Sequence, residues 1–136
     1  MLPSYEILPG QGVAQARFGE ERTDHRGRLG ERTSFERVPG SGLIDAYSDV
    51  TLMLSYDDRD LLREIEIGGA DTFVAGVQLL DRPLEEVLAD LRDAGIAPEF
   101  VGDQAFSLPG LGIYLITPAP EEPDVPTESV SVRPIE

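Results

Sequence analysis

The chain has 136 residues, with 26 Asp and Glu, 11 Arg, one His and neither Lys, Cys nor Trp, which gives a formal net charge of −15. The absence of Cys excludes disulfides, thiolate metal sites and thiol nucleophiles, and the absence of Lys excludes Schiff-base chemistry and the lysine of a phosphate-binding loop. Because this charge repels phosphate backbones and anionic membranes, we expect no nucleic acid or membrane as partner. We also expect no metal or cofactor.

The N-terminal segment MLPSYEILPG has neither the basic start nor the apolar stretch of a signal peptide, and no run of about 18 apolar residues follows in the sequence. We therefore expect a cytoplasmic protein. The length predicts one domain, which we place at residues 1–117. The pattern Pro-Gly-x-Gly at 9–12, 39–42 and 109–112 predicts turns, since it does not join a strand to a helix and no Lys follows it.

The first predicted helix lies in the segment ARFGEERTDHRGRLG, and it is poorly amphipathic. Its inner stripe would hold Arg22, His25 and Leu29, and Gly27 lies inside it, so we expect a short or loosely packed helix. His25 is the one side chain that ordinarily titrates near neutral pH. We favour a partly covered residue at a degraded core position. The alternatives are a residue that marks an interface, since Arg22 and His25 would be unusual inside a dry core, and a residue at the mouth of a ligand pocket together with Arg22.

Residues 50–56 and 61–67 alternate between apolar and polar side chains and predict a hairpin. Its loop, Asp57-Asp58-Arg59-Asp60, has turn chemistry, because Asp side chains accept hydrogen bonds from nearby backbone amides. A cation site there would need further oxygen ligands, whereas Leu62 and Arg63 occupy the later positions of a calcium loop. Phe73–Val77 predicts a further short strand.

The second predicted helix covers residues 82–94. Its apolar stripe repeats at i, i+3, i+4 and i+7 through Leu84, Val87, Leu88 and Leu91. We expect Asp81 to cap its start, Pro83 to occupy its first turn and Gly95 to end it.

Short strands are predicted at 100–101, 105–108 and 111–117. Residues 118–128, PAPEEPDVPTE, are rich in proline and acids and predict a linker or loop. Residues 129–135 alternate as a last strand would, and a disordered tail is the alternative.

An internal similarity supports two copies of one unit. Gly12-Val13 and Gly76-Val77 precede the two helices, and an ungapped alignment then places His25 opposite Val87 and Leu29 opposite Leu91. Repeat one covers about 10–70, and repeat two covers about 73–117 with the last strand. The predicted fold is α+β: two tandem helix-plus-antiparallel-strand repeats that form a sheet, with the helices packed on one face.

Residues 9–30, PGQGVAQARFGEERTDHRGRLG, resemble a segment of small bacterial proteins through Gly12, Val13, Gly19, Leu29 and Gly30. The pattern is similar to the repeat of SmpA/OmlA modules and of secreted β-lactamase inhibitor protein. The resemblance implies helices on an antiparallel sheet and no particular activity. Glu20, Glu21 and His25 depart from it, and the sequence has no lipoprotein cysteine.

For function, charge and size favour a non-enzymatic protein-binding module, such as an immunity or inhibitor protein that neutralises a basic partner. One alternative is a ligand-binding or catalytic domain with a pocket at Arg22 and His25, and another is a homodimeric structural protein. The contact set predicted for the first hypothesis consists of acidic residues on the hairpin and the second helix: Asp57, Asp58, Asp60, Glu64, Glu66, Glu85, Glu86 and Asp90.

Overall fold

The computed structural model describes residues 4–49, 51–102, 104–122 and 124–135. Within these ranges the chain forms two helices, α1 (Arg22–Leu29) and α2 (Leu84–Asp93), and is otherwise mainly sheet. The strands before α2 are β1 (Ser4–Leu8), β2 (Gly12–Val13), β3 (Ala16–Arg17), β4 (Arg32–Phe35), β5 (Ile44–Tyr47), β6 (Leu52–Tyr56), β7 (Leu62–Ile67), β8 (Asp71–Val74) and β9 (Val77–Gln78). Those after it are β10 (Glu99–Gly102), β11 (Ala105–Leu108), β12 (Ile113–Ile116) and β13 (Ser129–Val132).

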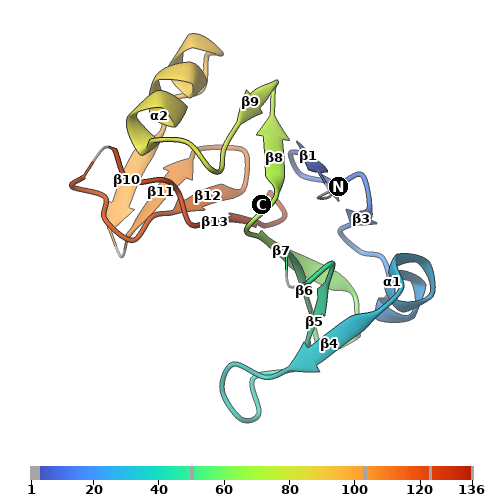
Figure 1. Ribbon diagram of the computed structural model, residues 1–136. Coiled ribbons are helices and arrows are strands. Elements are labelled where there is room, and N and C mark those ends of the chain that lie inside the picture. Colours follow the sequence, from blue (N-terminus) through green and yellow to red (C-terminus); the bar gives the residue numbers. More distant parts are fainter. Residues whose placement is uncertain (1–3, 50, 103, 123, 136) are drawn as a thin grey trace.

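The strands form two sheets. The smaller has the order β3-β2-β1-β8-β9, with β1 and β8 parallel, and the larger has the order β10-β11-β12-β13-β7-β6-β5-β4 with antiparallel neighbours throughout. Figure 1 shows β4–β7 with α1 at one end of the molecule, β10–β13 with α2 at the other, and β1 and β8 between them. The predicted α+β class is confirmed at this level.

The core lies where the strands of both sheets direct alternate side chains to the same side. In the large sheet, Ile65 and Ile67 of β7 are paired with Leu54 and Leu52 of β6, and the other side of β7 is paired with β13. These side chains are 0 to 2% exposed and belong to one cluster with β1, β8 and α2. Period-two alternation therefore builds a single core.

The second helix closely matches its predicted range. Leu84, Val87 and Leu91 are buried and Leu88 packs partly against the core, as the stripe predicts. The end at Gly95 is also confirmed: its amide bonds to the Arg92 carbonyl and the next amide bonds to that of Leu91, a Schellman arrangement with the glycine at positive φ.

The start of α2 differs from the prediction. The N-cap position is held by Pro83, not Asp81, and no side chain caps the helix. The amide of Leu84 instead donates to the Val125 carbonyl at 3.2 Å, so the segment after β12 satisfies the helix end. The predicted loop at 118–128 therefore lies against α2, and the predicted last strand begins at Ser129 as β13.

The single strand predicted at Phe73–Val77 is wrong. The chain turns at Ala75 and Gly76, both at positive φ, and β8 and β9 form a tight hairpin around them. Two consecutive positive φ values fit the right-handed twist of a hairpin, and an Ala at the first position hides this signal in the sequence.

The other predicted turns are confirmed. All three Pro-Gly-x-Gly segments connect neighbouring strands, with their glycines at positive φ. In the β6–β7 loop, Asp57 accepts hydrogen bonds from the amides of Arg59 and Leu61 at 2.9 and 3.0 Å, and these bonds lower its pKa.

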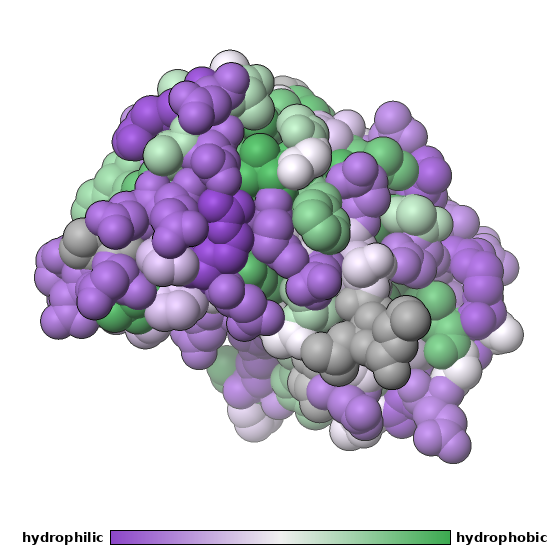
Figure 2. Space-filling model, turned by 45° about the horizontal axis from the view of Figure 1, so that its top comes forward, coloured by the Kyte–Doolittle hydropathy of each residue, from purple (hydrophilic) through white to green (hydrophobic). Residues whose placement is uncertain are grey.

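The surface is mainly hydrophilic in the view of Figure 2, with apolar side chains scattered between charged ones. Among the described residues, neither helix is long and apolar enough to cross a membrane.

Candidate functional site

A buried carboxylate is the centre of a polar cluster between α1 and the β4–β5 end of the large sheet. Asp45, in β5, is fully buried and binds Arg26 through both oxygens, at 2.9 and 3.1 Å. Ser34 donates to it at 2.8 Å, and the guanidinium groups of Arg22 and Arg32 lie at 3.2 and 3.9 Å. Burial alone raises the pKa of Asp45, but the hydrogen bonds from Arg26 and Ser34 and the charge of Arg22 more than offset this and lower it.

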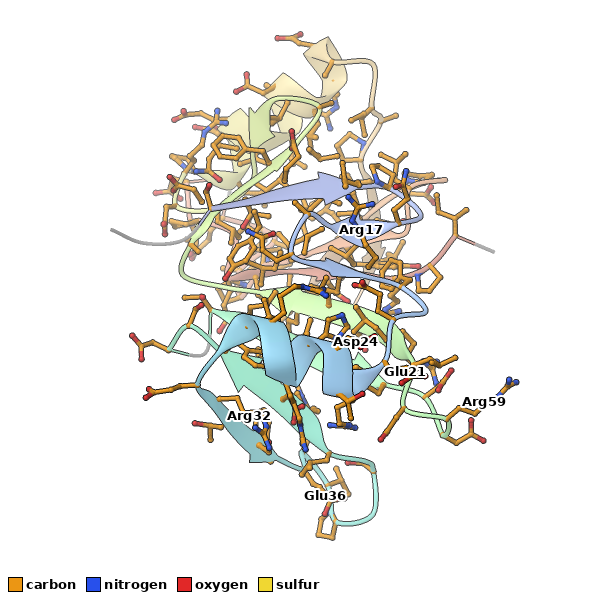
Figure 3. The ribbon with its side chains drawn as sticks, turned by 90° about the vertical axis from the view of Figure 1, so that its right-hand side faces the viewer. Arg17, Glu21, Asp24, Arg32, Glu36 and Arg59 are labelled. Carbon is orange, nitrogen blue, oxygen red and sulfur yellow. The ribbon has the colours of Figure 1, made fainter. Side chains whose placement is uncertain are left out.

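Arg22 connects this cluster to the β6–β7 loop and to the ring of Tyr56. It contacts Asp60 through Nε at 3.3 Å, donates to the Leu43 carbonyl at 3.1 Å and lies 4.3 Å from the centre of the Tyr56 ring. Figure 3 looks onto this side, where α1 lies across the strands and Arg59 projects from the loop into solvent. Arg22 therefore holds α1 against three separate elements.

His25 is fully buried beside this cluster, and both ring nitrogens are used. Nδ1 shares a hydrogen bond of 2.7 Å with the Tyr56 hydroxyl, and Nε2 lies 3.1 Å from a carboxylate oxygen of Glu20. The same Glu20 oxygen accepts from Arg28 at 3.1 Å. Burial raises the pKa of Tyr56, so its hydroxyl stays neutral over the physiological range.

The cluster is closed by these contacts. Arg22 and His25 do not line the cavities of about 620, 320 and 380 Å³ in the described part of the chain, although Tyr56 borders the second and Arg32 the third. The prediction of an inward stripe of Arg22, His25 and Leu29 is confirmed, because Arg22 has an 11% exposed side chain and Leu29 packs partly against the core. Sequence reasoning missed Asp45. Its neighbours in β5 are also buried, so the strand has no alternation that would distinguish a buried carboxylate from an exposed one.

Replacing Tyr56 with Phe should lower the free energy of unfolding by about 1–3 kcal/mol, because a buried ring nitrogen of His25 then loses its partner. Urea unfolding would measure the change. Tyr114→Phe is the matched control: that residue is half-buried and we expect less than about 0.5 kcal/mol. Equal effects of the two substitutions would contradict a role for the Tyr56 hydroxyl.

The predicted acidic contact set separates into two groups in the structure. The hairpin group is largely engaged within the chain: Asp57 builds the turn, Asp60 contacts Arg22, and Glu64 accepts from Ser131 at 2.7 Å. Glu66 is paired with Arg37 at 2.7 Å. Asp58 of this group is exposed and takes part in none of these contacts.

Glu64 and Glu66 line an open groove on the side of the large sheet that faces away from the core. Two cavities of about 620 and 320 Å³ share Arg63 and Glu64 along β7. The guanidinium group of Arg133 closes one side, 3.4 Å from Glu64 and over the ring of Tyr114. Acids and arginines therefore alternate in this groove, and its charge is nearly balanced.

The helix group, Glu85, Glu86 and Asp90, lies on the solvent side of α2, at the opposite end of the molecule from the hairpin loop (Figure 1). It is joined there by acids that the sequence analysis did not select. We call the combined surface of residues 81–93, 118–122 and 124–128 the acidic end. Its nine acidic residues are Asp81, Glu85, Glu86, Asp90, Asp93, Glu121, Glu122, Asp124 and Glu128.

The two segments of the acidic end are held together by backbone contacts. Pro83 and Pro126 form a bridge, and the Leu84 amide donates to the Val125 carbonyl. Of its two arginines, Arg82 is paired with Glu86 at 3.8 Å and with Asp90. Sequence reasoning missed the second segment because a proline-rich acidic stretch is typical of a linker, and no local signal places it against α2.

Among the described residues, no three His, Asp or Glu side chains lie close enough together to hold a metal ion. The described residues thus offer three candidate regions: an ion-pair cluster under α1, the charge-balanced groove along β7, and an open acidic surface around α2. No known protein family, curated protein or solved structure matches the chain, and the resemblance to SmpA/OmlA modules and β-lactamase inhibitor protein stays a prediction.

Proposed function

We propose that the protein is a non-enzymatic binding module for a basic protein, and that the acidic end is its contact surface. One observation carries this proposal. Residues 81–93 contact the segment 124–128 through Leu84 and Pro83, and together with 118–122 these residues hold nine of the 26 acidic side chains but two of the eleven arginines. Eight of the nine acids are exposed and Asp90 is 48% exposed.

The physical argument is electrostatic complementarity. An uncompensated patch of one sign attracts a partner of the opposite sign and speeds the encounter, at a cost of self-repulsion within the folded chain. At the α1 end several acids are instead paired with arginines, as Asp45 is with Arg26 and Glu66 with Arg37. This asymmetry favours the α2 end as the contact surface. Of the predicted contact set, the proposal therefore keeps the helix group, Glu85, Glu86 and Asp90.

We also propose that the chain consists of two tandem repeats, each with a small hairpin, a helix and four antiparallel strands. The strand order supports this. The last strands of the two sets, β7 and β13, pair at the middle of the large sheet, and the earlier strands of each set follow outward in reverse chain order to β4 and β10. The parallel pairing of β1 with β8 joins the corresponding hairpins. The repeats would then differ chiefly in charge, since α1 carries arginines toward the sheet and α2 carries acids toward solvent.

Neutralising the acidic end should abolish capture of the basic partner. In a pull-down from the native host, washed at low salt, we expect the wild-type bait to retain a basic protein at near-equal stoichiometry. A bait with Glu85→Gln, Glu121→Gln, Glu122→Gln and Asp124→Asn should lose it, because each neutralised side chain reduces the attraction. Mass spectrometry of the eluates measures the difference.

The matched control removes four charges from outside the acidic end through Glu6→Gln, Glu21→Gln, Asp24→Asn and Glu31→Gln. All four are exposed, so the change in net charge is the same. This bait should retain the partner. Equal loss with both baits would show that net charge alone acts, and retention by both would refute the acidic end as the contact surface.

A further inference from the structure

The outer edge of the large sheet at β10 exposes two adjacent apolar side chains. Phe100 is 54% exposed and Val101 is 50% exposed. The other large apolar side chains with high exposure among the described residues, Val38, Leu43 and Ile135, lie in loops or near the C-terminus. Single exposed apolar residues are ordinary, whereas an adjacent pair on an edge strand is not.

Local geometry explains why both side chains reach solvent. Phe100 pairs with Phe106, and Gly102 pairs with Ala105, so Val101 is an extra residue in β10. Such a bulge breaks the alternation that would otherwise send consecutive side chains to opposite faces. The ring of Phe100 lies 5.3 Å from that of Phe106, which fixes its position at the edge.

The two ends of the sheet differ in what they offer. β4, at the far end, is Arg-Thr-Ser-Phe; its Ser34 bonds to Asp45 and its Phe35 is half-buried. β10, Glu-Phe-Val-Gly, has the same burial pattern as β4 and likewise has a hydrogen-bonded neighbour on one side, here β11, but two of its three exposed residues are apolar, whereas those of β4 are polar. Its other side presents backbone amide and carbonyl groups to an incoming strand.

We propose that β10 receives an extended segment of the basic partner as an added strand, with Phe100 and Val101 making its apolar contacts. This inference rests on the proposed function and names where the partner's backbone binds. Strand addition gives affinity through main-chain hydrogen bonds and specificity through alternate side chains. The partner segment should therefore alternate apolar residues with Lys or Arg.

The negative charge of the chain favours a segment of a basic partner over a second copy of the chain as the added strand. Two copies would bring together two molecules of net charge −15 and two copies of Glu99, which begins β10. A basic segment meets Glu99 with opposite charge. It also approaches α2, because residues 94–98 alone separate that helix from β10, and both lie at the same end in Figure 1.

The test uses the full chain, labelled with ¹⁵N, and a blocked peptide that alternates lysine and valine. A peptide with glycine in place of valine has the same charge, and a third has its alternate backbone amides methylated. We expect the valine peptide to bind about tenfold more tightly than the glycine peptide and to shift the amide signals of residues 99–102. When the methylated amides are those of the peptide that would bond to β10, these shifts should be abolished.

A double variant, Phe100→Ser with Val101→Ser, should lose the preference for valine, and Val38→Ser with Leu43→Ser should keep it. Equal binding of the valine and glycine peptides, with shifts confined to α2, would overturn strand addition and leave the proposed function standing. Absence of any binding, together with failure of the pull-down, would overturn both. A dimer that the Phe100 and Val101 substitutions dissociate would identify a second copy as the occupant and overturn this inference.

Discussion

Replacing Asp45 with Asn is expected to lower the free energy of unfolding at neutral pH by about 3–5 kcal/mol. The side chain is fully buried, and Arg22 and Arg26 face it with side chains that are 11 and 29% exposed. Asn keeps the shape but removes the charge, so the guanidinium groups stay partly desolvated without compensation. Urea unfolding of both proteins at pH 7 measures the change.

The same pair of proteins should show a specific pH dependence. Because the pKa of Asp45 is lower in the folded than in the unfolded chain, the carboxylate stabilises the fold fully above the unfolded value, about 3.9. This stabilisation is lost as the pH falls through the lower, folded pKa. The difference between wild type and Asp45→Asn should therefore stay constant above about pH 5 and shrink toward zero in stronger acid.

Asp60→Asn provides the control, because Asp60 contacts the same Arg22 but has a 64% exposed side chain. An exposed pair contributes about 0–1 kcal/mol, so this variant should differ little from wild type at any pH. Equal effects of the two substitutions, or a difference for Asp45→Asn that does not shrink as the pH falls below about 4, would refute the assignment of Asp45 as the charged centre of the cluster.

Replacing Leu91 with Ala should lower the free energy of unfolding by about 2–5 kcal/mol. Leu91 is fully buried and belongs to the cluster that joins α2 to both sheets, so the substitution leaves a cavity. Ala favours the helix slightly, and helix propensity therefore cannot account for a loss. Thermal and urea unfolding both report the change.

Leu88→Ala makes the same chemical change three residues earlier on the same helix. Leu88 is only partly buried against the core, and we expect a loss below about 2 kcal/mol. The ratio of the two losses tests which side of α2 faces the core. A larger loss at Leu88 would show that the helix is rotated relative to the structure described above.

These experiments separate the two kinds of site in the molecule. The cluster around Asp45 is expected to affect stability and its pH dependence, and to leave partner capture unchanged while the chain is folded. The acidic end is expected to act in the opposite way, since its exposed acids contribute little to stability. A variant that changes both properties strongly would show that the two ends are coupled.

Local physical chemistry made much of the fold predictable from the sequence. The spacing of Leu84, Val87 and Leu91 determined α2, and Gly95 determined its end, because helix period and positive φ are properties of neighbouring residues. The Asp57 turn and the Pro-Gly-x-Gly turns were predictable for the same reason. The overall charge likewise followed from composition, and it is the basis of the proposal of a basic partner.

Tertiary structure alone decided which charged residues are available. Glu64 and Glu66 look like free acids in the sequence, yet their partners Arg133 and Arg37 are 69 and 29 residues away along the chain. Asp45 is likewise buried by contacts with α1, 19 residues earlier. Long-range ion pairs have no local signature, so the sequence cannot separate a structural carboxylate from an exposed one.

The segment 118–128 shows the same limit. Its composition predicts a linker, and the irregular backbone is indeed what the structure contains. Its position against the first turn of α2 depends on a hydrogen bond between residues 84 and 125 and on the pairing of β12 with β13, the strands on either side of the segment. The sequence determined that these acids exist, and the packing of distant elements decided that they form one surface.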